Sequence, residues 1–257
     1  MLIALAAGAC VGIAVGLAGG GGAVLAVPVL VYLLDQSVHA ATTESLVIVV
    51  GASGAGAISH ARHHVVCWRL AAAFAAAALP GSIVGTLANR AFAAELLLGA
   101  FAVLLLGVSV LTWRQGGGAR GEEGDRCPDL DLRAVALAGF AIGSLTGLFG
   151  VGGGFAVVPA LVLALRVPIR RAIATSLVIV TVVSAAGLVE HLIADADVAW
   201  DVALPFALAA MATASLGGTL AGRIPQHVLV RGFAVLLAAI AAYLIVSVTL
   251  LGGPPNG

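Results

Sequence analysis

Long apolar runs, separated by short polar or glycine-rich stretches, make up almost the whole chain. Reading these runs between charges and glycines predicts ten helical segments. A helix rises about 1.5 Å per residue and the apolar layer of a bilayer is roughly 30 Å thick, so segments 40–59 and 172–190 can cross it, while 23–34 and 155–165 reach only a little past its middle. The predicted segments are 2–18, 23–34, 40–59, 70–89, 94–113, 133–148, 155–165, 172–190, 202–222 and 226–251.

The two halves of the chain repeat one pattern. Residues 16–49 align without a gap with residues 147–180, and 16 of the 34 aligned positions are identical. Self-similarity of this kind indicates a duplicated unit. The identical positions include Pro28 and Pro159, and the block Ser45–Val49 is matched by Ser176–Val180.

The fold class predicted from this pattern is an all-α, polytopic membrane protein built from two repeats. Each repeat has five segments, and an odd number of crossings inserts the second repeat upside down, as in many secondary transporters. The glycine-rich loop before each short segment would lie inside the membrane, whether that pair of segments crosses fully or re-enters. The expected units are repeat 1 (1–113), a polar cytoplasmic linker (114–132), repeat 2 (133–251) and a C-terminal tail (252–257).

Composition excludes several classes of protein. Hydrophobic residues make up 61% of the chain and charged residues 9%, and the mean hydropathy is +1.16, so the chain is not a soluble globule. The formal net charge is zero, which leaves no basic face for nucleic acid. Cys10, Cys67 and Cys127 have neither CxxC nor CxxH spacing, so we interpret them as small fillers and one loop thiol rather than a disulfide framework or a metal site. No nucleophile–base pair occurs in the segments, so we expect neither an enzyme nor a cofactor.

The arginines predict the orientation in the membrane. Cytoplasmic loops carry an excess of positive residues, and ten of the twelve cationic residues fall in the odd-numbered loops between segments. The even-numbered loops hold Asp35, then Arg90, then the acidic stretch Asp195–Asp201. The odd loops are therefore predicted to be cytoplasmic and both termini to be outside. The ten arginines are Arg62, Arg69, Arg114, Arg120, Arg126, Arg133, Arg166, Arg170, Arg171 and Arg223.

The repeated glycine loops are the first candidate for a binding site. Glycines permit close backbone approach, and a helix that starts directly after such a loop, here at Ala23 and at Phe155, points unpaired N–H groups and a positive dipole at the loop. Two such starts meeting from opposite faces would bind a small anion. The alternative is close helix packing through small residues, which we assign to Gly8, Gly12, Gly99 and Gly107. The candidate glycines are Gly19, Gly21, Gly22, Gly150, Gly152 and Gly153.

Polar residues near the start of the third segment of each repeat are further candidates. Hydroxyl groups there either cap the helix or face a ligand. Glu44 stands opposite Thr175 of the second repeat, so it is either a first-turn carboxylate stabilised by the helix dipole or a proton-coupling group. His60 and His191 end these segments, as interfacial residues or proton relays. The hydroxyl candidates are Thr43, Ser45, Thr175 and Ser176.

The doubled Gly-x-x-Gly-x-Gly-Gly loop, the proline six residues later and the Thr-Ser-Leu start of the next segment resemble the sulfite exporter TauE/SafE family. The resemblance covers almost the whole chain outside 114–132 and implies export of small oxyanions, such as sulfite or organosulfonates, across the cytoplasmic membrane. Glu44 departs from the pattern, which has threonine there. Repeat 2 keeps Gly147, Gly150, Gly152, Gly153, Pro159, Thr175, Ser176 and Leu177, and repeat 1 keeps Gly16, Gly19, Gly21, Gly22, Pro28, Ser45 and Leu46.

The sequence thus predicts a multi-pass secondary transporter whose partners are a small anion and the lipid bilayer, with homo-oligomer formation left open. A passive anion channel and a non-transporting membrane scaffold are the alternatives. No ring of like charges lines a segment, which argues against the channel.

The orientation can be tested by labelling. In a background without the native cysteines, a thiol reagent added from outside should modify a cysteine introduced at Ala196, in the acidic loop, and not one at Ala119, in the linker. Labelling at Ala119 alone would invert the predicted topology.

Overall fold

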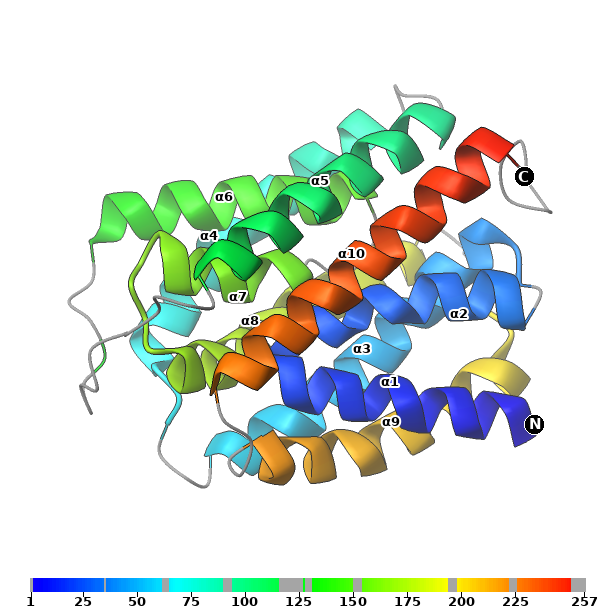
Figure 1. Cartoon of the computed structure of the whole chain (residues 1–257), viewed down its shortest axis with the longest axis horizontal. Helices are drawn as coiled ribbons and strands as arrows, with labels where there is room; N and C mark the ends of the chain where they lie inside the picture. Colours follow the sequence, from blue (N-terminus) through cyan, green and yellow to red (C-terminus); the bar gives the residue numbers. More distant parts are fainter. Residues whose placement is uncertain are drawn as a thin grey trace.

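The computed structural model describes residues 2–34, 36–61, 65–89, 94–115, 127, 131–149, 154–193, 198–221 and 226–250. The secondary structure of these residues is helical, as predicted, with short non-helical connections, and Figure 1 shows the helices as one bundle. The helices are α1 (Leu2–Ala18), the 3₁₀ helix η1 (Gly19–Leu25), α2 (Ala26–Leu33), α3 (Val38–Ala61), α4 (Trp68–Asn89), α5 (Ala94–Gln115), α6 (Leu132–Phe149), α7 (Gly154–Leu163), α8 (Ile169–Ile193), α9 (Trp200–Ala221) and α10 (Gln226–Leu250).

The apolar pattern predicted these helices closely, because each predicted segment corresponds to one α-helix and ends within three residues of it. Four of the helices in the described residues, α3, α4, α8 and α9, contain an apolar stretch long enough to cross a membrane. Large apolar side chains such as Val103, Leu137 and Leu216 are exposed on the outside of the bundle. A surface of this kind is suited to lipid, and the protein is a multi-pass membrane protein.

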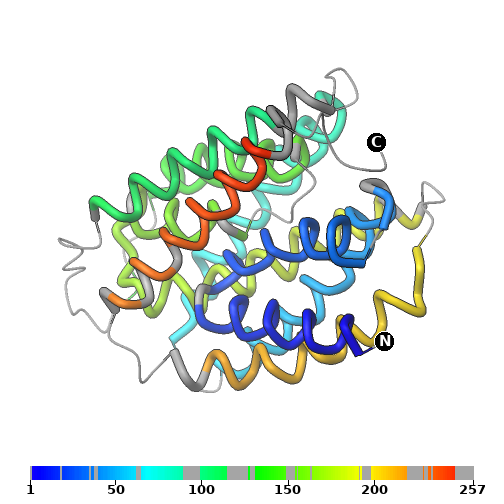
Figure 2. The backbone as a smooth tube through the Cα atoms, turned by 45° about the vertical axis from the view of Figure 1, so that its right-hand side comes forward, coloured from blue at the N-terminus to red at the C-terminus, as the bar shows by residue number. Residues whose placement is uncertain are grey.

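Helix packing follows the two repeats. Helix α1 of repeat 1 is equivalent to α6 of repeat 2, and α4 is equivalent to α9. Helix α1 packs along α9 and α6 packs along α4, so these two pairs are equivalent to each other. Helices α3 and α8 pack against each other, as do α5 and α10, and each of these two pairs consists of equivalent helices. In Figure 2, α5 and α10 lie side by side and run in opposite directions. The packing is therefore symmetric under exchange of the repeats, while their inversion across a bilayer stays a prediction.

The two ends of the bundle differ in which helix ends they carry. In Figure 1 the ends of α3, α5 and α9 lie toward the left, and the start of α1 and the end of α10 lie toward the right. In the sequence, the helices that end on the left are each followed by an arginine-containing odd loop. We call this side the arginine-rich end.

Glycines set the close approach of the two equivalent helix pairs. A Cβ built on Gly8, Gly12 or Gly16 of α1 would meet backbone atoms of α9, and one on Gly139, Gly143 or Gly147 of α6 would meet backbone atoms of α4. Such small-residue ladders let membrane helices touch through their backbones. The packing role predicted for Gly8 and Gly12 is confirmed. The same prediction is wrong for Gly99 and Gly107, where an added Cβ would meet nothing within 4 Å. The backbones facing the two ladders belong to Phe206, Ala210 and Ala214, and to Phe74, Ala78 and Ser82.

This difference predicts opposite effects of the same substitution. Gly143→Ala would push its Cβ into the Ala78 carbonyl and should destabilise the protein by about 1–3 kcal/mol, the usual cost of overpacking. Gly107→Ala, in open space, should be neutral or stabilise α5 by roughly 0.5–1 kcal/mol. Thermal unfolding in detergent measures both. Equal melting temperatures for the two variants would show that α4 and α6 do not need the glycine.

Cys67 and Cys127 form a disulfide, with a Cα–Cα distance of 5.8 Å. The interpretation of these two residues as filler and loop thiol is therefore wrong. They are 60 residues apart, and no local spacing signals a pair that forms because tertiary folding places Cys127 beside the residue that precedes α4. The Arg171 guanidinium, in the first turn of α8, donates to Cys127 Sγ at 3.6 Å, so Cys67, Cys127 and Arg171 lie together at the arginine-rich end.

The disulfide gives a second test of orientation. Cytoplasmic thiols are kept reduced, whereas disulfides persist in oxidising compartments. If the arginine-rich end is cytoplasmic, a membrane-permeant alkylating reagent added to intact cells before lysis should find Cys67 and Cys127 as free thiols, and the bond should form in oxidising buffer. A disulfide already present in intact cells would place this end outside and overturn the predicted topology.

Candidate functional site

The first glycine motif is helical, not unwound. Gly19 has a left-handed φ of +67°, which only glycine adopts readily, and the reversal of the chain after α1 occurs there. The next residues wind into η1, which passes into α2 through Leu25 in right-handed helical conformation. The helix therefore starts about one turn before Ala23, and the predicted start is wrong. The reason is that Gly19 alone accommodates the reversal of the chain, so the other three glycines can adopt helical conformation.

The first motif packs directly against the second repeat. A Cβ on Gly19 would lie 2.6 Å from Ser176 Oγ of α8. A Cβ on Gly154, the first residue of α7, would collide with the Gly20 carbonyl group, and one on Gly20 would lie 3.0 Å from the Cα of Gly154. Gly19 to Gly22 are all buried. The glycine motif of one repeat and the first turn of α7 in the other thus meet inside the protein.

The predicted glycines divide into three groups. Gly19 faces the other repeat, whereas Gly22 faces its own repeat, where a Cβ would collide with the backbone of Ala14 and Val15 in α1. Gly21 is buried in η1. Gly150, Gly152 and Gly153 lie outside the described residues.

The candidate hydroxyl residues are all buried, but they do not cap helices. Helix α3 begins at Val38, where Ser37 Oγ accepts the Ala40 N–H (3.3 Å), and α8 begins at Ile169. The capping alternative is therefore wrong, because the helices start earlier than the apolar pattern indicated. Ser45 Oγ donates to the Thr42 carbonyl (2.7 Å), and Ser176 Oγ donates to the carbonyl of Ile173 (2.8 Å). The buried hydroxyl residues are Thr43, Ser45, Thr175 and Ser176.

Glu44 is completely buried and contacts the other repeat. Its Oε1 accepts the backbone N–H of Ala199, directly before α9, at 3.1 Å. Its Oε2 is buried without a hydrogen-bond partner among the described residues. The first-turn alternative is wrong, since Glu44 lies in the second turn of α3 and binds the start of α9 instead.

The two histidines lie near the ends of the central helices, His60 in α3 and His191 in α8. His60 Nδ1 donates to the Gly56 carbonyl (3.0 Å), and the ring lies against Gly218 of α9. Sixteen residues of helix separate His60 from Glu44, about 24 Å at 1.5 Å per residue, so no direct proton transfer joins them. The side chain of His191 lies outside the described residues.

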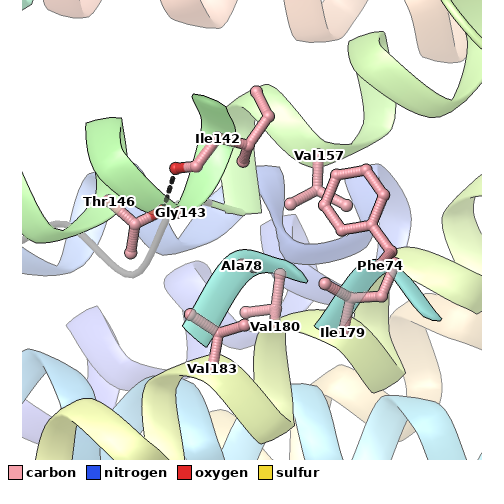
Figure 3. A pocket seen from close by; sticks show the side chains of 9 residues that line it. All are labelled: Phe74, Ala78, Ile142, Gly143, Thr146, Val157, Ile179, Val180 and Val183. Atoms are coloured by element: carbon pink, nitrogen blue, oxygen red, sulfur yellow. Dashed lines mark hydrogen bonds between the residues drawn. The ribbon is translucent and has the colours of Figure 1, made fainter. Parts of the chain in front are cut away.

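A pocket between α4, α6, α7 and α8 is apolar. In Figure 3, Val157, Ile179 and Val180 project toward it, and its one hydroxyl, that of Thr146, donates to the Ile142 carbonyl at 2.8 Å. Its lining therefore offers an anion no unengaged side-chain donor. The remaining lining residues are Phe74, Ala78, Gly143 and Val183.

A hydroxyl pair at the crossing of α3 and α8 was missed from the sequence. Thr181 Oγ1 donates to Ser53 Oγ at 2.9 Å. One turn further along α8, Ser184 Oγ is buried without a hydrogen-bond partner among the described residues. Ser53 and Ser184 are equivalent positions of the two repeats, and this match was the signal that could have identified them.

Comparisons with known proteins find relatives that are described as probable membrane transporters. The chain is 34% identical over 251 residues to a probable membrane transporter protein of Xylella fastidiosa strain Temecula1, covering 95% of both chains. It is 28% identical over 198 residues to one of Methanocaldococcus jannaschii, covering 74% of this chain and 72% of the relative. A probable membrane transporter protein of Bacillus subtilis is 25% identical over 250 residues, covering 89% and 91%.

No solved structure matches the chain. The family model described as "Sulfite exporter TauE/SafE" matches residues 4–244, which include both repeats and the linker. The chain therefore belongs to the TauE/SafE family of membrane transporters.

Proposed function

We propose that this protein is a secondary transporter that exports a small oxyanion, such as sulfite or an organosulfonate, across the cytoplasmic membrane. The observation that carries the proposal is the contact of Gly19 and Gly20 with Ser176 and Gly154. It brings a backbone segment free of side chains from one repeat against a helix start of the other. A site shared by two repeats is where the common transporter plan binds its substrate.

The chemistry of this meeting point suits an anion. The first residues of a helix have N–H groups without intrahelical partners, and the helix dipole adds positive potential there. At η1 and α7 these groups belong mainly to glycines and small residues, so few side chains shield the backbone, and an anion would reach it once the contact between Gly20 and Gly154 opens. The hydroxyl of Ser176 lies beside Gly19 and can turn from the Ile173 carbonyl toward an oxyanion. Neutral donors bind an anion less tightly than cationic side chains would, and a transporter must be able to release its substrate.

Transport is tested by counterflow in liposomes. Liposomes that contain the protein and are preloaded with unlabelled sulfite, sulfonate, sulfate or thiosulfate should accumulate the matching labelled anion from outside against its gradient. Flux without competition or counterflow would indicate a passive channel, and no flux for the whole panel would favour a scaffold.

The binding site is tested by Gly19→Ala. An alanine there must adopt a left-handed φ, at a cost of about 1–2 kcal/mol, and its methyl group displaces the Ser176 hydroxyl. Sulfite binding in detergent should weaken by about tenfold or more, since 1.4 kcal/mol corresponds to one decade.

Two further variants separate binding from packing. Gly107→Ala, in open space, should leave the affinity unchanged. Gly22→Ala, which collides with α1, should lower the melting temperature and shows what a packing defect alone does to binding. If Gly19→Ala binds sulfite as well as Gly107→Ala does, the anion site does not lie at the glycine motif.

A further inference from the structure

Two hydrogen bonds cross between the repeats at equivalent positions. Glu44 Oε1 of α3 accepts the N–H of Ala199, directly before α9, at 3.1 Å. Thr175 Oγ1 of α8 accepts the N–H of Cys67, directly before α4, at 3.1 Å. Glu44 and Thr175 are matched by the repeat alignment, and α9 and α4 are equivalent helices. We call these bonds the α9 latch and the α4 latch.

The latches lie at opposite ends of the bundle. Leu46 lies against Gly187 and Leu177 lies against Gly56, which places the start of each of α3 and α8 beside the end of the other. The α4 latch is at the arginine-rich end, because Cys67 is tied there to Cys127. The α9 latch is at the other end. Each bond therefore joins the central helix pair to an outer helix at one end, where a transporter must open and close.

The two acceptors differ in one chemical respect. The Thr175 hydroxyl is neutral at every pH of interest, whereas the Glu44 carboxyl gains or loses a proton. Glu44 is completely buried, one oxygen accepts one N–H, and the other has no partner among the described residues. A buried charge without compensating bonds is costly, and a neutral acid with its proton on Oε2 avoids that cost.

The other ionisable groups near Glu44 do not supply a counter-charge. On α9, Asp201 acts on Glu44 as a like charge. On α8, Glu190 lies at a similar level along the helix pair but is exposed. Helix α1 contributes only Cys10, which is exposed, and α2 contributes Tyr32, whose ring packs edge-on against Tyr243. Within the described residues, no cation on a helix packed against α3 faces the carboxyl.

We propose that Glu44 is the proton-binding site of this transporter and that its proton controls the α9 latch. The closed latch holds the carboxyl in its neutral form. Opening this end admits water, the carboxyl ionises, and the proton leaves to the solvent on that side. The α4 latch opens and closes without a proton. The proposal deepens the transport function by naming the proton as the coupling ion, and it rests on that function only for the use of the proton in transport.

Linkage gives the expected size of the effect. If the closed form holds one proton more than the open form, raising the pH favours the open form by about tenfold per pH unit across the window between the two states' titrations. Acid closes the α9 end and alkali opens it. The arginine-rich end should show no such response.

The test needs no substrate. A fluorophore attached to Val198→Cys, next to the α9 latch, in a protein with the three native cysteines replaced by alanine, reports water access through quenching by acrylamide, a neutral quencher. In the parent protein the ratio of quenched to protected label should rise with pH. In Glu44→Gln and in Glu44→Thr, which copies the other repeat, this ratio should be independent of pH. The infrared band of a protonated carboxyl should also be lost in both variants.

Matched controls show whether the effect is specific. Glu190→Gln removes an exposed carboxyl at a similar level along the helix pair and should keep the pH response. Thr175→Val breaks the α4 latch and should also keep it. A parent protein whose quenching does not change with pH would overturn the proposal. So would a pH response that persists in a monodisperse Glu44→Gln protein, or one that Glu190→Gln abolishes as well.

A transport assay then connects the site to function. An organosulfonate keeps its charge across this pH range, so its counterflow isolates the protein's own titration. Glu44→Gln should lose the response of organosulfonate flux to a pH gradient. Failure of all flux would refute the proposed transport but leave the quenching result standing, while a flat quenching curve with intact flux would refute only the proton site.

Discussion

The structure depends on backbone contacts that only residues without a Cβ allow. Gly20 and Gly154 touch where the first glycine motif meets the start of α7, and a methyl group on either residue would collide with its neighbour. The same constraint recurs along α1 and α6, whose glycines lie against the backbones of α9 and α4. In a bilayer, where apolar surface alone does not favour one helix neighbour over another, such close approach decides which helices pair.

Symmetric packing with asymmetric chemistry is the second feature of the protein. Exchange of the repeats relates the helix pairs, the glycine ladders, the hydrogen bonds of Ser45 and Ser176, and the two latches. The exchange is broken at Glu44, where a carboxyl replaces a hydroxyl, and at Cys67, whose partner Cys127 lies in the linker. Because only one of the two ends has an ionisable residue at this position, the two ends can respond differently to pH, which chemically identical ends could not.

The arginine-rich end combines two signals that point to different compartments. Its arginines are typical of cytoplasmic loops, whereas a stable disulfide is typical of an oxidising compartment. Cys127 lies beside Arg171, and Cys67 donates its N–H to Thr175 of the α4 latch. One hydrogen bond thus connects the thiol pair to Thr175, a candidate binding residue. Whether the pair is oxidised bears on the mobility of this end as well as on its orientation.

The helices, the duplication and the membrane class follow from the order of residues along the chain. Apolar runs and their interruptions are local, and sixteen identities in an ungapped alignment need no structure to interpret. The sequence also singled out Gly19 and Ser176, because repetition marks positions under a common constraint, and Glu44, because it breaks the repetition. It misassigned Gly99 and Gly107, since a glycine that packs against a helix and one in open space look the same in one dimension.

The contacts of these residues became known only from the folded arrangement of the helices. It placed Gly19 against Ser176, turned Gly22 toward α1, bound Glu44 to Ala199 and paired Cys67 with Cys127. Each of these contacts joins segments that are distant in the chain, or depends on one backbone angle such as the left-handed φ of Gly19. Local patterns of hydrophobicity and charge carry no information about such contacts, because they are fixed by the packing of complete helices against one another.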